Sequence, residues 1–465
     1  MSESHPTNRR DFVKLAAAGL AGLAALPSGL AALTPAASPI RPRRGRHLAG
    51  FAAPKLEVVR WGIIGLGERG IPMLQETLLL EGCAITALCD TREAALNQGL
   101  ELVAKAGRPR PAAYGDSPEA YRRLCERDDV DAIMIMTPWR LHTPMAVAAM
   151  RAGKHAFVEV PACVTVEECW QLVEVAEETR RHCMMMENCC YGREELLVLN
   201  LCRQGLLGEL LHGEASYVHD LRFQMKQLEF GCGSWRCREH ELRDGNLYPT
   251  HGLGPVAQYL GINRGDRFER LVSFSSPSLG MPDYAARNFP EGHPRRTAHY
   301  VCGDVNTALI RTARGRTVML QHNTMSPTPY SRHNVIRGTR GVFAGFPHRI
   351  YVEERSPQAH RWETDLTRWY QEFDHPLWKK VGEIAARSDQ LGGMGHGGMD
   401  FVMKWRLVQC LREGLPLDQD VYDAAAWSVV GPLTEQSVAA GGAPVEVPDF
   451  TRGQWQATAP LGIVT

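Results

Sequence analysis

The chain carries no net charge, because its 465 residues contain 52 Lys and Arg against 52 Asp and Glu. Proteins that bind nucleic acid or an anionic membrane surface usually present a broad basic field. The absence of such a field favours a small, neutral partner and argues against a nucleic-acid partner.

The sequence also lacks the usual metal-binding motifs. It has no His-Glu-x-x-His, and Cys232 and Cys237, which are expected to flank a loop, are too widely spaced for a Cys-x-x-Cys pair. Many of the thirteen cysteines lie in apolar runs typical of buried thiols. We therefore predict no metal.

The apolar stretch over residues 15–33 is interrupted by Gly19, Gly22, Pro27 and Gly29, which disfavours a stable membrane-spanning helix, so we predict no membrane span. It follows a close match to the twin-arginine export pattern, Asn8-Arg9-Arg10-Asp11-Phe12-Val13-Lys14. Small residues at 34–38 offer a cleavage site. We predict a twin-arginine leader over 1–38, which sends the folded protein to the periplasm or another extracytoplasmic space. A cytosolic amphipathic helix is the alternative. A basic linker is predicted over 39–56.

Strand-like and helical patterns alternate strictly in the next part of the chain. Buried strands are expected over 58–65, 83–90, 130–136, 155–160 and 182–186, with helices over 91–106, 117–127, 144–153 and 165–181. Such alternation is typical of a doubly wound parallel sheet. We assign 57–190 to a Rossmann domain.

The pattern changes after residue 190. A helix over 194–204 precedes strand-like segments at 211–219, 269–275, 304–311, 317–323, 333–338 and 341–346. Helical patterns return over 397–435. The sequence therefore predicts an α/β protein whose second domain, 191–465, has a mostly antiparallel open sheet and C-terminal helices.

A glycine-rich turn joins the first strand to the first helix. Gly65 permits the tight turn, Gly67 lets the backbone approach a pyrophosphate, and Gly70 allows close packing of the helix. Asp90 ends the second strand, where a carboxylate binds the adenosine ribose and disfavours a 2′-phosphate. We predict NAD as the cofactor, although Arg92 keeps NADP open.

Polar residues also follow three neighbouring strands, at the edge where doubly wound sheets bind ligands. They are Thr137 to His142, Glu159-Val160, and Glu187-Asn188. The predicted cofactor-binding residues are Gly65, Gly67, Glu68, Arg69, Gly70, Asp90, Thr137, Trp139, Arg140, Leu141, His142, Glu159, Val160 and Asn188.

The segment 243–255, Arg-Asp-Gly-Asn-Leu-Tyr-Pro-Thr-His-Gly-Leu-Gly-Pro, concentrates polar chemistry in a stretch with little apolar burial. Tyr248 and His251 are the candidate catalytic groups, because proton transfer needs groups whose pKa can be tuned. A histidine titrates near neutrality, which favours His251 as the base. A structural, helix-capping histidine is the alternative. Glu239, Glu241 and Asp244 are expected to form a solvated charged loop.

The glycine turn, the turn over 137–142 and Glu159-x-Pro161 resemble the glucose–fructose oxidoreductase and inositol dehydrogenase superfamily. Its usual Glu-Lys-Pro has Val160 in place of lysine here, and Leu247 stands where an Asp commonly precedes the catalytic His by four residues. Within that superfamily, residues 159–162, 187–191, 244–258 and 262–268 resemble glycoside hydrolase family 109.

The resemblance implies an NAD-dependent α-N-acetylgalactosaminidase with a glycan or small-molecule substrate. Such enzymes are exceptions to the two-carboxylate rule of glycosidases. The sugar is oxidised at C3, loses the C2 proton, eliminates the aglycone from C1, adds water there and is reduced at C3. The outcome is retention, and NAD is recycled without net consumption.

The resemblance also implies a sugar site and an assembly. The sugar would be lined by Tyr217, Arg236, Tyr248, Pro249, Thr250, His251 and Tyr330. A homodimer could form through the open sheet. Two other functions remain open: an exported NAD(P)-dependent sugar dehydrogenase, and a non-catalytic NAD or sugar sensor.

Overall fold

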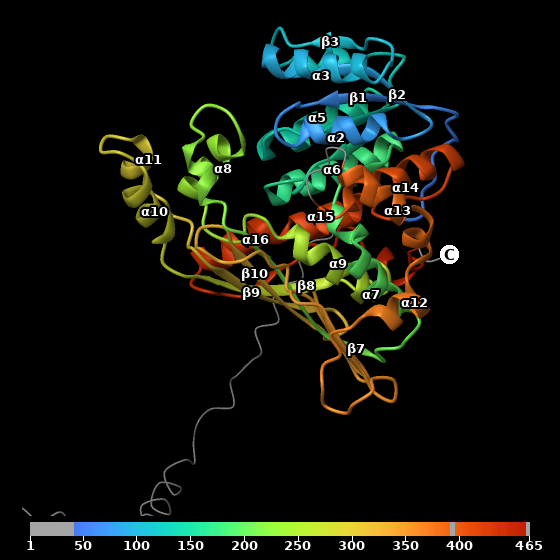
Figure 1. Ribbon diagram of the computed structural model, residues 1–465, viewed down its shortest axis with the longest axis vertical. Helices are drawn as coiled ribbons and strands as arrows, with labels where there is room; N and C mark the ends of the chain where they lie inside the picture. Colours follow the sequence, from blue (N-terminus) through green and yellow to red (C-terminus); the bar gives the residue numbers. More distant parts are fainter. Residues whose placement is uncertain (1–40, 391–395, 462–465) are drawn as a thin grey trace, which may run out of the picture. The chain divides into compact units, whose positions relative to one another are not determined.

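The computed structural model describes residues 41–390 and 396–461 (Figure 1). The predicted leader lies outside these residues. No helix in the described ranges combines the length and apolar character that crossing a bilayer requires.

The first sheet has six parallel strands in the order β3-β2-β1-β4-β5-β6. The central strands are buried on both faces, as parallel strands covered by helices must be. The chain leaves β1 toward β2 on one side and returns to β4 on the other, which places the topological switch point at the end of β1. The strands are β1 Val59–Ile64, β2 Cys83–Cys89, β3 Ala112–Tyr114, β4 Ala132–Ile135, β5 His155–Val158 and β6 Cys183–Met185.

Helices alternate with these strands, so the predicted doubly wound fold is confirmed. They are α2 Gly70–Leu78, α3 Glu93–Lys105, α4 Tyr121–Cys125, α5 Trp139–Arg151 and α6 Val166–Thr179. Two details differ from the prediction. The short strand β3 was not expected, and α5 begins at Trp139, after Pro138, rather than at Pro144. The turn predicted over 137–142 is therefore mostly the first turns of a helix.

The second sheet has eight strands in the order β13-β12-β11-β7-β10-β9-β8-β14. Only β7 and β10 pair in parallel, which confirms a mostly antiparallel sheet. In β9, buried and exposed residues alternate, as expected for a sheet covered on one face. The strands are β7 Leu210–Val218, β8 Phe268–Ser275, β9 Asn306–Thr312, β10 Thr317–Asn323, β11 Val335–Gly338, β12 Gly341–Ala344, β13 Arg349–Val352 and β14 Val445–Glu446.

Helices of the second half cover one face of this sheet and also reach the first domain. Helix α9 packs on β7 and α16 on β8, while α14 contacts β1 and α2, and α15 contacts α6 and β6 (Figure 1). The helices are α7 Arg193–Arg203, α8 Cys232–Leu242, α9 Thr250–Leu260, α10 Gly280–Asn288, α11 Pro294–Thr297, α12 Thr367–Phe373, α13 Pro376–Gln390, α14 Met399–Glu413, α15 Val421–Ser428 and α16 Val430–Ala439, with 3₁₀ turns η1 Asn188–Tyr191, η2 Arg222–Lys226 and η3 Gln454–Gln456.

The predicted loop between Cys232 and Cys237 is wrong, because both cysteines lie in α8. Apolar residues do not recur at helical spacing there, so the pattern gave no helical signal. The expected solvated loop is also wrong for Glu239. Its side chain is buried in α8 and pairs with Arg140 and Arg243.

The described part of the predicted linker packs against the protein. Leu48 is buried and its N–H donates to the Tyr422 hydroxyl at 3.1 Å, while the His47 ring stacks on Tyr422. Arg43 lies 3.3 Å from the buried carboxylate of Glu177 in α6. These contacts hold the segment against α6 and α15.

Candidate active site

The glycine turn has the backbone that a pyrophosphate cradle requires. Gly65 adopts φ +90°, and a Cβ there would lie 2.4 Å from the Met136 carbonyl oxygen. A Cβ on Gly70 would lie 2.0 Å from the Gly65 carbonyl oxygen, so only glycine lets α2 start this close. A Cβ on Gly67 would meet nothing nearer than Arg92 at 3.7 Å, which leaves space above the turn. These residues fit a dinucleotide.

Asp90 holds this turn from the end of β2. One carboxylate oxygen accepts from the Leu66 N–H at 2.7 Å and the other from the Arg92 N–H at 2.8 Å. Each oxygen keeps a second lone pair for a ribose hydroxyl. The neighbouring Arg92 guanidinium is 3.7 Å from the same carboxylate, so its charge is already partly paired.

Two predicted cofactor residues, Arg69 and Asn188, meet at a carboxylate that the sequence did not identify. Arg69 pairs with Asp400 of α14 at 2.6 Å and with Glu159 at 2.7 Å. Asn188 donates to Asp400 at 2.9 Å, and His396 Nδ1 lies 2.7 Å from it. The Arg69 and His396 charges and hydrogen bonds outweigh burial and keep the pKa of Asp400 well below its usual value. Asp400 therefore ties α14 to the predicted nicotinamide side.

The predicted cofactor residues at the start of α5 do not all face the candidate site, because some of them hold strand ends together instead. Both ring nitrogens of buried His142 lie within 2.8 Å of backbone carbonyls, those of Pro161 and Thr137, so the ring joins two strand ends. Thr137 contributes that carbonyl, whereas Leu141 is 42% exposed. Val160 is buried and presents no polar side chain where the superfamily has its lysine.

Helix α8 and the loop before it join the second half to the glycine turn and to α5. The Cys232 N–H donates to Glu68 at 3.1 Å, and Gln227 donates to the same carboxylate. The Arg140 guanidinium donates to buried Glu239 at 2.6 Å. Helix α8 and its preceding loop therefore connect the predicted cofactor residues to the predicted sugar residues.

The predicted sugar residues cluster beside α8. Trp139 lies 5.7 Å from the Tyr248 ring and 4.8 Å from that of Trp235. The Arg236 guanidinium is 5.7 Å from the Tyr248 ring, a distance compatible with a cation–π contact. Its Nε is buried with no hydrogen-bond partner, so one N–H remains available to a ligand oxygen.

Tyr217 at the end of β7 stacks obliquely on Tyr248, with ring centroids 4.5 Å apart, and meets Tyr330 edge-on at 6.4 Å. Its hydroxyl is 3.1 Å from Nδ1 of His219, a residue that the sequence did not single out. Pro249 caps α9, whereas Thr250 is fully buried at the start of that helix. The structure therefore places Tyr217, Tyr248 and Tyr330 together.

Tyr248 and His251 are in contact. The Tyr248 hydroxyl lies 3.3 Å from His251 Nε2, and His251 Nδ1 lies 2.7 Å from a Glu187 carboxylate oxygen. Burial, aided by Tyr217, raises the pKa of Tyr248 well above its usual value. The phenol therefore keeps its proton at neutral pH. Glu187 ends the segment after β6 and was seen in the sequence only as a polar strand terminus.

One group of side chains in the described residues has the spacing of metal ligands: Glu187, Cys189 and His251, with ligand atoms within 4.8 Å of one another. Burial raises the pKa of the Cys189 thiol well above its usual value, so the thiolate that binds metals is disfavoured. Two of the three ligand atoms already share a short hydrogen bond. The arrangement fits proton transfer better than metal binding.

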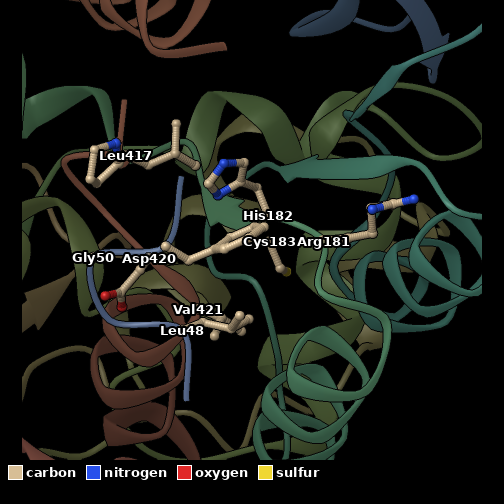
Figure 2. Close-up of a pocket in the computed structure, with 10 residues that line it drawn as sticks. Leu48, Gly50, Arg181, His182, Cys183, Leu417, Asp420 and Val421 are labelled. Carbon is tan, nitrogen blue, oxygen red and sulfur yellow. The ribbon is translucent and has the colours of Figure 1, made fainter. Parts of the chain in front are cut away.

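A small pocket lies at the opposite, amino end of β6 (Figure 2). The residues that line it are Leu48, Gly50, Phe51, Arg181, His182, Cys183, Pro416, Leu417, Asp420 and Val421. It contains none of the predicted site residues.

Comparisons with known proteins agree with this arrangement. Residues 59–187 match the model "Oxidoreductase family, NAD-binding Rossmann fold", and residues 191–457 match "Glycosyl hydrolase 109, C-terminal domain". The chain is 54% identical over 462 residues to a Shewanella oneidensis protein named alpha-N-acetylgalactosaminidase, and 53% identical to a "Glycosyl hydrolase family 109 protein" from Shewanella baltica. Each alignment covers 99% of both chains.

Solved structures show the same fold at low identity. An NAD-binding oxidoreductase from Klebsiella pneumoniae superimposes with a TM-score of 0.66 at 18% identity, covering 85% of this chain and 100% of that one. A levoglucosan dehydrogenase in complex with NADH and L-sorbose gives 0.63 at 18% identity, with the same coverage.

The fold and the glycine turn define an NAD-binding, two-domain protein of the oxidoreductase type. Within that class, the chain belongs to glycosyl hydrolase family 109. The predicted family, NAD cofactor and NAD-dependent glycoside hydrolase activity are thereby confirmed.

Proposed function

We propose that the protein hydrolyses terminal α-linked N-acetylgalactosamine with retention, by oxidation, elimination, addition and reduction on the sugar. The observation that carries this proposal is the 54% identity, over 99% of both chains, to a protein named for that activity. The hydrogen-bonded Glu187, His251 and Tyr248 side chains support it, because they supply proton-transfer groups where the superfamily's lysine is replaced by Val160.

Bound NAD would supply the hydride acceptor, and later the hydride donor, for the sugar. The residues that would hold it are those of the glycine turn, with Asp90 at the ribose and Arg69, Glu159 and Asn188 near the nicotinamide. Asp400 would keep this last group in place through its bonds to Arg69 and Asn188.

His251 would act as the base. Its Nε2 faces the Tyr248 hydroxyl, so a proton released by a sugar hydroxyl or by C2 can reach the ring directly or through the phenol. Tyr248, whose pKa is raised by burial, would act as a hydrogen-bond donor and return a proton to the departing oxygen. Arg236 would donate to a sugar hydroxyl or to the acetamido oxygen, and Tyr217 would pack against the ring.

The test is aglycone release from p-nitrophenyl α-N-acetylgalactosaminide in heavy water, without added NAD. We expect release together with deuterium at C2 of the product sugar, whose first-formed anomer is α by proton NMR. His251→Asn is the matched inactive variant, with an expected loss of about 10²-fold or more in kcat. Release without C2 deuterium would refute the elimination route. No release, with steady NADH formation from free sugars, would favour a dehydrogenase instead.

Export by the twin-arginine route is a second part of the proposal. It is supported by Arg9-Arg10 and the weakly apolar run that follows them, which lie outside the described residues. Replacing both arginines with lysine should retain the protein in the cytoplasm of an expressing bacterium. Unchanged export in that variant would contradict this assignment.

The proposed homodimer uses the uncovered face of the second sheet. Phe274 of β8 and Leu309 of β9 are 62% and 48% exposed, and their strands are paired. Leu309→Glu should shift the sedimentation coefficient from dimer to monomer. A wild-type protein that sediments as a monomer at micromolar concentration would exclude this surface.

A further inference from the structure

The carboxylate of Glu187 is completely buried and held in one orientation. The same oxygen, Oε1, accepts from the Cys189 N–H at 3.1 Å and lies 2.7 Å from His251 Nδ1. The Glu187 carbonyl oxygen accepts from the Gln419 side chain at 3.0 Å, which fixes the backbone. Neither the chain nor the side chain of Glu187 is free to turn away from His251.

This carboxylate is ionised. Burial alone acts to raise the pKa of Glu187, but the charge and hydrogen bond of His251, together with the hydrogen bond from the Cys189 N–H, lower it below the usual value. An ionised carboxylate only accepts hydrogen bonds. The atom facing it, His251 Nδ1, must therefore carry a proton.

The groups around His251 leave Glu187 as its anionic partner. The other nitrogen, Nε2, faces the Tyr248 phenol, which is a donor. Burial raises the pKa of Tyr217 to about 12 and lowers that of His219, so both are neutral at neutral pH. The charged or titratable neighbours are Glu187 and Cys189 beside η1, Tyr217 and His219 on β7, Tyr248 before α9, and Arg236 on α8.

We infer that Glu187 is the positioning residue of the proposed reaction: it locks His251 in the Nδ1–H tautomer, leaves Nε2 as the proton acceptor toward Tyr248 and the sugar, and stabilises the imidazolium that forms. Glu187 acts through His251 and does not touch the substrate. This inference rests on the proposed function for its catalytic meaning, whereas the tautomer itself is a property of the resting protein.

The first test is therefore independent of activity. Nitrogen NMR of the full-length protein, labelled with ¹⁵N-histidine, distinguishes the protonated from the unprotonated ring nitrogen, and the spectrum of His251→Asn assigns the signal. Above the pH at which the ring becomes neutral, we expect Nδ1 protonated and Nε2 unprotonated. A ring protonated at Nε2 overturns the inference, whether or not the protein hydrolyses any glycoside.

Two substitutions separate the charge of Glu187 from its shape. In Glu187→Gln the side-chain amide oxygen can still accept from the Cys189 N–H, which holds that oxygen toward His251 Nδ1. The tautomer should therefore persist while the negative charge is lost. We expect a roughly 10-fold fall in kcat, and the acidic limb of the pH profile should move to lower pH because the imidazolium loses its anionic partner. Glu187→Leu removes charge and acceptor, so kcat should fall by about 10²-fold or more and the Nδ1–H signal should lose its dominance. KM should change little in both variants.

Glu177→Gln is the matched control. Glu177, on α6 and outside the candidate site, is another buried glutamate. Its carboxylate pairs with Arg452 and accepts a hydrogen bond from the Tyr422 hydroxyl. It should lower stability without moving the pH profile or the NMR signal of His251. An unchanged kcat and pH profile in both Glu187 variants would overturn the inference. Absence of aglycone release from the wild-type protein would overturn the proposed function and leave the tautomer measurement to decide the position of the proton.

Discussion

Two buried histidines should make the first domain sensitive to acid. His155 and His182 stand at the amino ends of β5 and β6, with ring centroids 5.0 Å apart, and His182 lines the pocket of Figure 2. Burial, reinforced by the charges of His155 and Arg181, lowers the pKa of His182 to about 3. Burial and Arg181 lower the pKa of His155 to about 4.

The sign and size of the effect follow from these values. Both folded-state pKa values lie below the ordinary 6.5, so the unfolded chain takes up protons first as the pH falls. Stability is complete above pH 6.5 and is lost progressively between pH 6.5 and about 4 to 3. At pH 5, about 1.5 units below the unfolded pKa, each histidine costs about 2 kcal/mol, or about 4 kcal/mol for the pair. A typical domain has only about 5–15 kcal/mol to lose.

Urea unfolding between pH 8 and pH 5 measures this cost. In the double variant His155→Asn, His182→Phe, the Asn oxygen can still accept the 3.0 Å hydrogen bond from the backbone N–H of residue 182. Phe replaces a ring whose Nε2 has no partner. We expect the double variant to lose about 3–4 kcal/mol less than wild type over this range. Exposed His360→Asn is the control and should behave as wild type. Equal pH dependence in wild type and double variant would refute the reasoning.

Two further predictions concern the glycine turn and the buried ion pair between Lys404 of α14 and Glu76 of α2. Gly70→Ala should destabilise the protein by about 1–3 kcal/mol, since its Cβ would lie 2.0 Å from the Gly65 carbonyl oxygen. Gly67→Ala should fold normally but bind NAD more weakly by calorimetry; equal melting temperatures for the two variants would contradict this contrast. Lys404→Met should cost about 3–5 kcal/mol in urea unfolding, because it leaves the buried Glu76 carboxylate without its 2.7 Å partner. Adding Glu76→Leu should restore most of that loss, and a purely additive double variant would show that the pair is not coupled.

The first domain could be predicted in detail because its signals are local. The central strands are mostly apolar, and the turn from Gly65 to Gly70 stands directly between a strand and a helix. The strand β3 escaped prediction because three residues are too few for any period to show. Helix α8 escaped because its first turns, Cys-Gly-Ser-Trp-Arg, carry no helical apolar spacing.

The candidate site was less accessible to sequence reasoning, because its decisive contacts are distant in the chain. Tyr248 and His251 are three residues apart, so their proximity could be inferred from the sequence. Glu187, the partner of His251, is 64 residues away and could not be inferred in this way. Asp400 meets Arg69 across 331 residues. The packing of α14 against β1, and of both α14 and α9 against η1, brings these groups together.

The position of α8 has a kinetic consequence. Its contacts from Cys232 to Glu68 and from Glu239 to Arg140 join α8 to the glycine turn and to α5. Because Glu68 belongs to the turn that would hold the nucleotide, we expect release of a bound nucleotide to require the separation of these contacts. We therefore expect exchange of the nucleotide with bulk solution to be slower than turnover, so that one NAD molecule would serve many successive sugars.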